Sequence, residues 1–197
     1  MTQDKRLALV LLLNLGMVVA LVVVGLTAHS LGVLAAGGDY VGDAAGVALS
    51  LAALRLRRRH GNQRITSYAA LANATFLLMV TAVVIIEGLK RLIDGSGHVE
   101  GLPVIIVSVI AVLIMAICAL IIGSVERDDL NMRSVMLDTL TDAASSGGVA
   151  ISGAMILAVN GAYWLDPAVA LGIAAIIAYH AARLIRDVLV ALREQPG

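Results

Sequence analysis

The sequence predicts an all-α membrane protein with six transmembrane helices, and three observations lead to this fold class. Of the 197 residues, 60% are hydrophobic and 14% are charged, whereas a soluble domain is nearer ~45–50% apolar and ~25% charged. Aromatic residues make up only 3%, which suits a bundle of Leu, Val, Ala and Gly better than a soluble core. Lys+Arg and Asp+Glu are 14 each, and this zero net charge argues against a nucleic-acid partner and against an acidic disordered chain.

Six stretches reach the length of about 20 mostly apolar residues that a transmembrane helix needs. In chain order they cover approximately 7–28, 31–54, 67–92, 102–125, 134–159 and 167–191. Lys5 and Arg6 precede the first stretch as in a signal peptide, but its run of about 22 apolar residues exceeds the ~7–15 of a signal core. We therefore expect a retained first helix, and residues 1–197 as a single six-helix domain without a soluble domain.

The basic residues are divided unevenly between the two sides that these spans would create. Only Lys90 and Arg91 fall on one side, and the other side holds the remaining twelve of the 14. These twelve are Lys5, Arg6, Arg55, Arg57, Arg58, Arg59, Arg64, Arg127, Arg133, Arg183, Arg186 and Arg193. The positive-inside rule then predicts cytoplasmic termini, in a multi-pass protein of the inner cell membrane if the source is prokaryotic.

Four aspartates lie well inside predicted spans, where a carboxylate costs ~2.5–3.5 kcal/mol on insertion scales. Asp39 and Asp43 are in the second span, and Asp138 and Asp142 are in the fifth. Each pair has i,i+4 spacing, which projects both carboxylates from one helix face. Because the two spans run in opposite directions, a rise of 1.5 Å per residue brings both pairs near the middle of a core about 30 Å thick. Four such charges suit a divalent cation, protons, or the exchange of one for the other.

Other polar and small residues in the spans have simpler interpretations. The structural alternative is that the aspartates only form hydrogen bonds with nearby hydroxyl groups, although one polar residue would serve at lower insertion cost. These hydroxyl residues are Thr139, Thr141, Ser145 and Ser146. Glu87 is expected in an interfacial ion pair with Lys90 or Arg91 rather than in a metal site. A stripe of small residues lies one position behind the aspartates and predicts close helix contact there. The stripe consists of Gly38, Gly42 and Gly46.

Several motifs together resemble the transmembrane half of the cation diffusion facilitator family, whose members are six-helix exporters that exchange divalent metal for protons. In chain order the motifs are Asn14, Ser30-Leu31-Gly32-Val33-Leu34-Ala35 before Asp39-x-x-x-Asp43, Asn73, Asn131-Met132-Arg133 before Asp138-x-x-x-Asp142, and Trp164-Leu165-Asp166-Pro167. The resemblance implies one tetrahedral site for a transported metal on Asp39, Asp43, Asp138 and Asp142. It implies no cofactor, and its partners are the divalent metal, protons and the lipid bilayer.

Three departures from the family pattern bear on these expectations. Many zinc-selective members have His at the position of Asp138, and acids expected elsewhere are replaced by Ala36 and Thr66. We expect no counterpart of the family's cytoplasmic C-terminal domain, which dimerises and binds regulatory metal. A homodimer is therefore a possible assembly rather than an expected one. An all-oxygen site favours manganese or iron, whereas tetrahedral geometry favours zinc or cadmium. We expect zinc with broad divalent tolerance, and a manganese- or iron-preferring exporter is the alternative.

The remaining candidate ligands and function classes are weaker. Single histidines and acidic loop residues could bind cations, or form a second metal site at the cytoplasmic end of the bundle. They could equally be ordinary solvated or packed side chains without a metal. These residues are His29, His60, His98, His180, Glu126, Asp128 and Asp129. Cys118 is the only cysteine, which excludes a disulfide framework and a Cys-based zinc site. An intramembrane aspartyl protease would need Gly-x-Gly-Asp and Pro-Ala-Leu, and the chain has Gly37-Gly38-Asp39 and no Pro-Ala-Leu. We expect no enzyme; a passive channel or a structural subunit is the remaining alternative.

Overall fold

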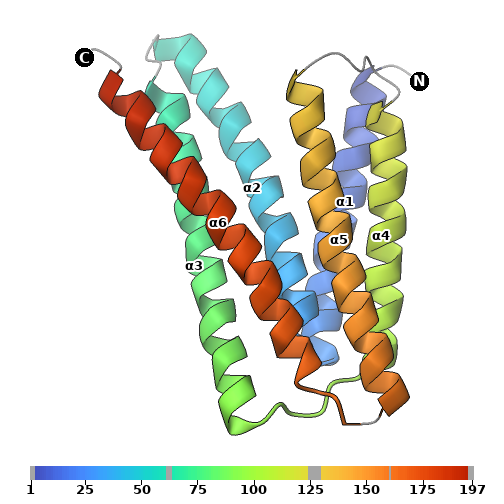
Figure 1. Cartoon of the computed structure of the whole chain (residues 1–197). Coiled ribbons are helices and arrows are strands. Elements are labelled where there is room, and N and C mark those ends of the chain that lie inside the picture. Colours follow the sequence, from blue (N-terminus) through green and yellow to red (C-terminus); the bar gives the residue numbers. More distant parts are fainter. Residues whose placement is uncertain (1–2, 61–63, 124–129, 160, 195–197) are drawn as a thin grey trace.

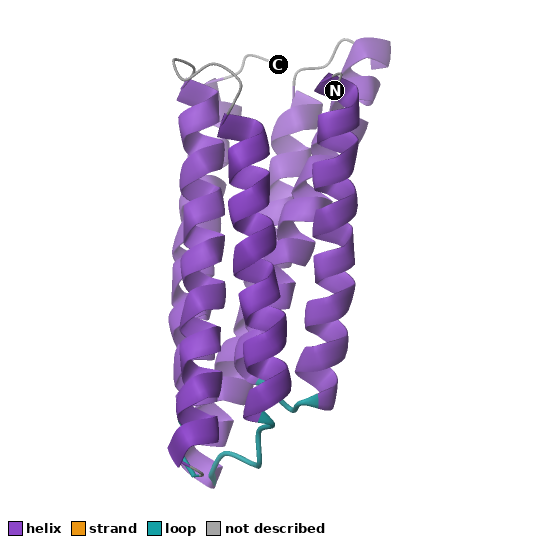
Figure 2. Cartoon of the chain, turned by 90° about the vertical axis from the view of Figure 1, so that its right-hand side faces the viewer, coloured by secondary structure: helices purple, strands orange, loops and turns teal. Residues whose placement is uncertain are grey.

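The computed structural model describes residues 3–60, 64–123, 130–159 and 161–194, and these residues form six helices joined by turns and loops, with no strand among them. The helices are α1 (Gln3–Thr27), α2 (Leu31–His60), α3 (Arg64–Asp94), α4 (Gly101–Gly123), α5 (Leu130–Val159) and α6 (Leu165–Glu194). All six run roughly along one direction (Figures 1 and 2). The predicted all-α class is confirmed.

Helix α2 extends further than the hydropathy of the sequence predicts. The apolar stretch predicted over 31–54 ends before the helix does, because α2 continues to His60 and α3 begins at Arg64. Arginine is a good helix former, and cations are favourable near a helix C-terminus. The helix therefore continues where the apolar pattern ends.

Three helices contain described stretches that are long and apolar enough to cross a membrane. They are Ser67–Asp94 in α3, Thr141–Val159 in α5 and Leu165–Val190 in α6. Shorter apolar stretches, Leu12–Thr27 and Gly101–Ile117, lie in α1 and α4. The apolar bundle is that of a multi-pass membrane protein, and the count of six spans stays a prediction.

The helices form two groups that lie closest together at one end of the bundle. In Figure 1, α2, α3 and α6 make one group and α1, α4 and α5 make the other. We call the end where α1 begins and α6 ends the N/C end, and the opposite end the distal end. The groups separate toward the N/C end (Figure 1). The most extensive contacts join α3 to α6 and α4 to α5, and α2 contacts both α1 and α5 across the divide.

Glycines allow the closest helix contacts within each group. A Cβ at Gly38 would lie 2.9 Å from Cγ1 of Val80, and one at Gly42 would overlap the end of Leu77. The predicted small-residue stripe therefore packs α2 against α3; the side chain at position 46 is outside the described part. On α4, a Cβ at Gly101 would lie 2.7 Å from the carbonyl oxygen of Gly153 on α5.

The turn between α1 and α2 ends one helix and begins the next within three residues. The Ser30 N–H donates to the carbonyl oxygen of Gly25 at 3.0 Å, and His29 between them has a φ of 57°. This is the Schellman pattern, in which the residue after the helix takes the left-handed conformation. Ser30 is the N-cap of α2, because its Oγ accepts a hydrogen bond from the Val33 N–H at 3.1 Å. The position of the α2 N-terminus is thus set directly by the end of α1.

Candidate metal site

The two aspartate pairs lie on helices that touch each other. Asp39 on α2 is half-buried and Asp43, one turn further along, is exposed. On α5, Asp142 is buried with 9% of its surface exposed. Asp138 also belongs to α5, but its side chain is outside the described part. Contact between α2 and α5 agrees with the expectation that these helices face each other.

One packing contact fixes how α2 and α5 are aligned. A Cβ built at Gly32 would lie 3.5 Å from Cγ2 of Val149, so these two residues are level. Asp39 is seven residues beyond Gly32 and Asp142 is seven residues before Val149, a distance of about 10 Å along each antiparallel helix. Asp39 is therefore level with Asp142. By the same count, position 43 is level with position 138, one turn nearer the N/C end.

The described residues hold three of the four predicted ligands. Asp39, Asp43 and Asp142 each interact with another group. Within this part of the chain, no three His, Cys, Asp or Glu side chains form a group that could hold a metal ion. The side chain of Asp138 lies outside this part of the chain, so the four-aspartate site stays a prediction.

One of the hydroxyls near Asp142 does not serve as its hydrogen-bond partner. Ser146, one turn along α5, is buried, and its Oγ has no hydrogen-bond partner among the described residues. It therefore does not bond Asp142. A cavity of about 510 Å³ opens beside this stretch between α5 and α6, and both Thr141 and Ser145 line it.

Two of the other predicted candidates lie in a pocket apart from the aspartates. His29 and His98 line a separate pocket of about 500 Å³ at the distal end, together with Arg91 and Glu100. The guanidinium of Arg91 makes this pocket unsuitable for a cation. His180 is exposed on α6, with its ring 5.8 Å from that of Tyr179. The side chain of His60, and residues Glu126, Asp128 and Asp129, are outside the described part.

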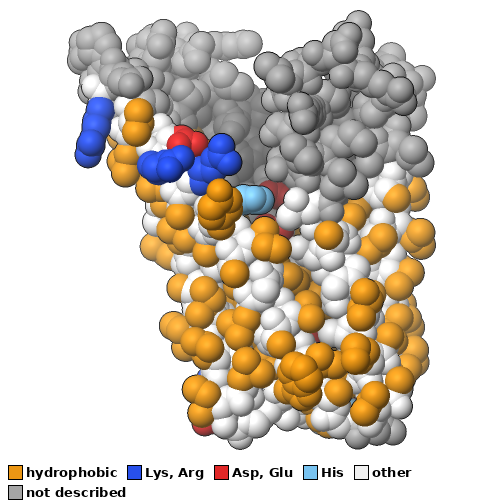
Figure 3. All heavy atoms as spheres, in the orientation of Figure 1, with side chains coloured by type: hydrophobic (Ala, Val, Ile, Leu, Met, Phe, Trp, Pro, Cys, Tyr) orange, Lys and Arg blue, Asp and Glu red, His pale blue; other side chains and the backbone are white. Residues whose placement is uncertain are grey.

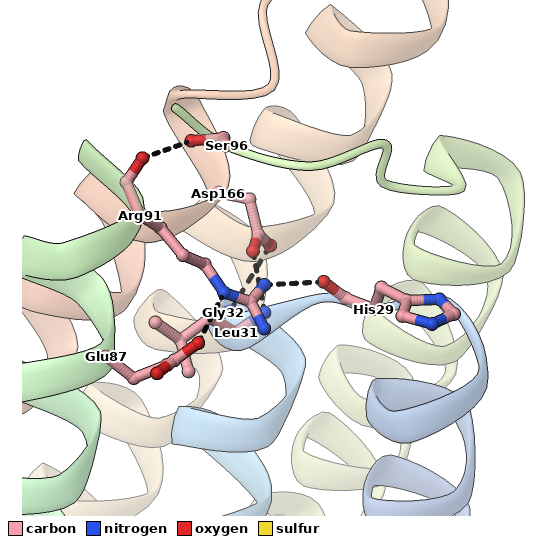
Figure 4. Close-up of polar contacts among 7 residues, drawn as sticks. All are labelled: His29, Leu31, Gly32, Glu87, Arg91, Ser96 and Asp166. Atoms are coloured by element: carbon pink, nitrogen blue, oxygen red, sulfur yellow. Dashed lines mark hydrogen bonds and ion pairs between the residues drawn. The ribbon is translucent and has the colours of Figure 1, made fainter. Parts of the chain in front are cut away.

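Glu87 forms the expected ion pair with a neighbouring basic residue. Its Oε1 accepts a hydrogen bond from Nε of Arg91, four residues along α3, at 3.2 Å. Nη1 of Arg91 donates to the carbonyl oxygen of His29 at 2.7 Å. Glu87 therefore holds an arginine that ties α3 to the turn between α1 and α2, and it is not part of the aspartate site (Figure 4).

Asp166 is a buried carboxylate that the sequence analysis did not identify as functional. It lies in the first turn of α6 with none of its surface exposed. Its carboxylate accepts hydrogen bonds from the Leu31 N–H at 2.6 Å and from the Gly32 N–H at 3.2 Å (Figure 4). It also accepts one from Oγ of Ser30 at 2.5 Å. The available signal was the pairing of two family-like motifs, Ser30-Leu31-Gly32 and the segment before Pro167, but no local pattern says that they touch.

Charged side chains are distributed unevenly on the described surface. Figure 3 shows hydrophobic side chains over most of the visible flank and Lys or Arg side chains gathered toward the N/C end. The described arginines near the end of α6 are Arg183, Arg186 and Arg193. Lys90 and Arg91 lie near the end of α3, at the distal end. The same asymmetry in the sequence predicts that both termini face the cytoplasm.

Comparison with known proteins places the chain among metal transporters. A family model described as the cation efflux transmembrane domain matches residues 7–193. The zinc transporter ZitB of Pectobacterium atrosepticum is 31% identical over 202 residues, which cover 97% of this chain and 62% of that protein. The metal cation efflux system protein CzcD of Cupriavidus metallidurans is 28% identical over 174 residues, covering 85% of this chain and 54% of that protein.

A third relative, from Bacillus velezensis, is named a cadmium, cobalt and zinc/H(+)-K(+) antiporter and is 25% identical over 183 residues, covering 88% of this chain and 58% of that protein. The chain thus spans about three fifths of the length of the curated relatives that it matches. These relatives are transporters rather than enzymes, as expected from the sequence. The family match over nearly the whole chain shows that this protein belongs to the cation efflux family, also called the cation diffusion facilitator family.

Proposed function

We propose that this chain forms the metal-translocating bundle of a divalent-cation exporter in which Asp39, Asp43, Asp138 and Asp142 hold the transported ion. The observation that carries the proposal is the alignment of α2 and α5, which makes Asp39 level with Asp142 and position 43 level with position 138. Membership of the cation efflux family supports it. The metal is the substrate of the protein, and no further cofactor is part of the proposal.

Zinc is the proposed preferred substrate, with tolerance for cadmium and other divalent ions. Relatives are named for zinc, and one is named for cadmium and cobalt as well. Four carboxylates are hard oxygen ligands, which suit manganese or iron better than an imidazole-containing site would. A manganese- or iron-preferring exporter is therefore the second candidate, and this all-oxygen set of residue types is the observation that favours it.

Proton exchange by alternating access is the proposed mechanism. A carboxylate oxygen cannot hold a proton and a metal ion in the same lone pair, so metal binding releases protons and protonation releases metal. Asp43, one turn nearer the N/C end, is exposed while Asp142 is buried. This difference supports entry of metal from the N/C end, which the proposal assigns to the cytoplasm, and release beyond the distal end.

The test is zinc transport by purified protein in proteoliposomes with a zinc-sensitive dye and a pH-sensitive dye inside. We expect zinc uptake to move protons in the opposite direction, and we expect Asp142→Asn to abolish both signals. Asp187→Asn is the matched control, because it neutralises an exposed carboxylate on α6 that pairs only with nearby arginines in the described part. Zinc flux that ignores the pH gradient would refute the exchange, and full transport by Asp142→Asn would refute the site.

The same vesicles give the metal preference and the orientation. Competition of cadmium, manganese and iron with zinc ranks the substrates, and a manganese or iron signal above that of zinc would select the second candidate. Labelling of a cysteine introduced at the N/C end, from either side of a cell membrane, decides whether the termini face the cytoplasm. Light scattering of the purified protein decides whether it forms a homodimer.

A further inference from the structure

The carboxylate of Asp166 forms a joint between the beginnings of α2 and α6. The first three N–H groups of α2 all have acceptors there: Asp166 accepts from Leu31 and Gly32, and Ser30 Oγ accepts from Val33. A helix normally receives such caps from the residue just before it. Here the second cap comes from a residue 135 positions away in the sequence. Capping of α2 and attachment of α6 are thus the same interaction.

The joint leaves little room for α2 to slide or rotate. Both carboxylate oxygens are used, with Oδ2 accepting from Leu31 and Oδ1 from Gly32 and Ser30. A Cβ at Gly32 would lie 3.1 Å from Oδ1 of Asp166, a tight contact that favours glycine at this position. A shift of α2 by one residue would move these donors by about 1.5 Å along the axis and turn them by about 100°, which would break the bonds.

The same helix carries half of the proposed metal site. Asp39 and Asp43 are eight and twelve residues beyond Leu31 on the uninterrupted α2, or about 12 and 18 Å along its axis. A Cβ added at Gly32 would also lie 3.5 Å from Cγ2 of Val149 on α5, so the joint fixes α2 at the height where Asp39 is level with Asp142. A change at the joint would therefore alter the alignment of the proposed ligands without touching them.

We propose that Asp166 is a positioning residue for metal transport: through its bonds to the first turn of α2, it holds Asp39 and Asp43 opposite the aspartates of α5. This inference rests on the proposed function, because it assigns a consequence to the alignment of those ligands. Asp166 itself is not a ligand, since its oxygens are occupied by three donors. Loss of the joint is expected to weaken metal binding rather than only to lower the yield of folded protein.

The experiment separates capping from positioning by moving the carboxylate. Asp166→Ala removes the attachment of α6 and leaves the start of α2 with the Ser30 cap alone. Combining Asp166→Ala with Ser30→Asp returns a carboxylate to the start of α2 from the residue just before it and still leaves α6 unattached. For the folded fraction of each variant, KM and maximal rate for zinc are measured in proteoliposomes, together with thermal stability. Asp187→Asn, at an exposed position of α6, is the control. We expect the double variant to regain stability and still to show a zinc KM at least ten times that of the unaltered protein.

A second measurement does not depend on transport. With Cys118 replaced by Ala, spin labels at Ala52 on α2 and Met155 on α5 report the distance between the helices in metal-free protein. We expect a displaced or broader distance distribution in both Asp166→Ala variants and an unchanged one in Asp187→Asn. If Asp166→Ala alone does not fold, the double variant gives the answer.

Each outcome decides one of the two claims. A zinc KM and a label distance unchanged in the double variant would overturn the positioning role and leave Asp166 as a cap alone. An unaltered protein that does not transport zinc would overturn the proposed function. In that case a changed distance between the spin labels in the Asp166 variants would still show that Asp166 fixes the position of α2. The proposed role of Asp166 in transport would be refuted.

Discussion

Replacing Gly101 by alanine tests whether the backbone contact between α4 and α5 is as close as the structure shows. The added Cβ would lie 2.7 Å from the carbonyl oxygen of Gly153 and 3.2 Å from Cβ of Leu157. Carbon–oxygen contacts normally begin near 3.3 Å, so the helices would have to separate by several tenths of an ångström. The obstacle is backbone, which no rotamer change can relieve. Overpacking of this kind typically costs about 1–3 kcal/mol, and we expect a loss in the free energy of unfolding within that range.

The assay is reversible unfolding in mixed micelles followed by circular dichroism, with two comparison variants. Gly147→Ala on α5 meets no atom within 4 Å, and we expect it to stabilise by roughly 0.5–1 kcal/mol because alanine favours the helix. Gly42→Ala meets the end of the Leu77 side chain, which can rotate, so its cost should lie between the other two. Equal stability of Gly101→Ala and Gly147→Ala would refute the close α4–α5 contact.

Three further predictions concern single side chains. Asp138→His replaces a hard oxygen ligand by an imidazole and should lower manganese transport more than zinc transport; competition curves in vesicles measure this, and an unchanged order of metals would exclude Asp138 as a ligand. His29→Gly should change the free energy of unfolding by less than about 1 kcal/mol, since relief of left-handed strain is partly offset by unfolded-state entropy, whereas His29→Val should cost more. Glu87→Gln removes a partly exposed ion pair and should cost less than about 1 kcal/mol with zinc flux retained; loss of flux would mean that Arg91 must be held in place.

The helices could be predicted from the sequence because the hydropathy signal is strong and local. Each predicted span overlaps one observed helix, and the first observed residue of α2, Leu31, is the predicted one. The helix ends next to charged residues were not predictable in this way, as the continuation of α2 to His60 shows. Hydropathy reports where apolar side chains stop, whereas a helix ends where its backbone hydrogen bonds stop.

The site was predictable only in part, for a similar reason. The i,i+4 spacing of Asp39 and Asp43 is visible in the sequence, and so is the opposite direction of the fifth span. The contacts of Asp166 with the start of α2 join residues about 135 positions apart, and no local pattern specifies such a pair. In the sequence Asp166 is visible only as part of the family-like motif before Pro167, although in the structure it is fully buried.

Asp166 and the aspartates of α2 and α5 illustrate two ways to accommodate a carboxylate in an apolar bundle. Asp166 meets the start of a helix, where backbone N–H groups have no intrahelical acceptor, and these fixed donors stabilise its charge. Asp142 lies in the middle of α5, where the N–H groups are already bonded to carbonyl oxygens four residues back.

Under the proposed function, the charge of Asp142 is balanced by something that can leave, either a proton or a metal ion. Replacing the carboxylate by an amide should then change the free energy of unfolding of the metal-free protein in different directions at Asp166 and at Asp142. Asp166→Asn should lower the free energy of unfolding, because the new amide cannot accept from all three donors. Asp142→Asn should leave that free energy unchanged or raise it, because it removes a costly charge. A metal-free protein that Asp142→Asn destabilises as much as Asp166→Asn would mean that both carboxylates are structural.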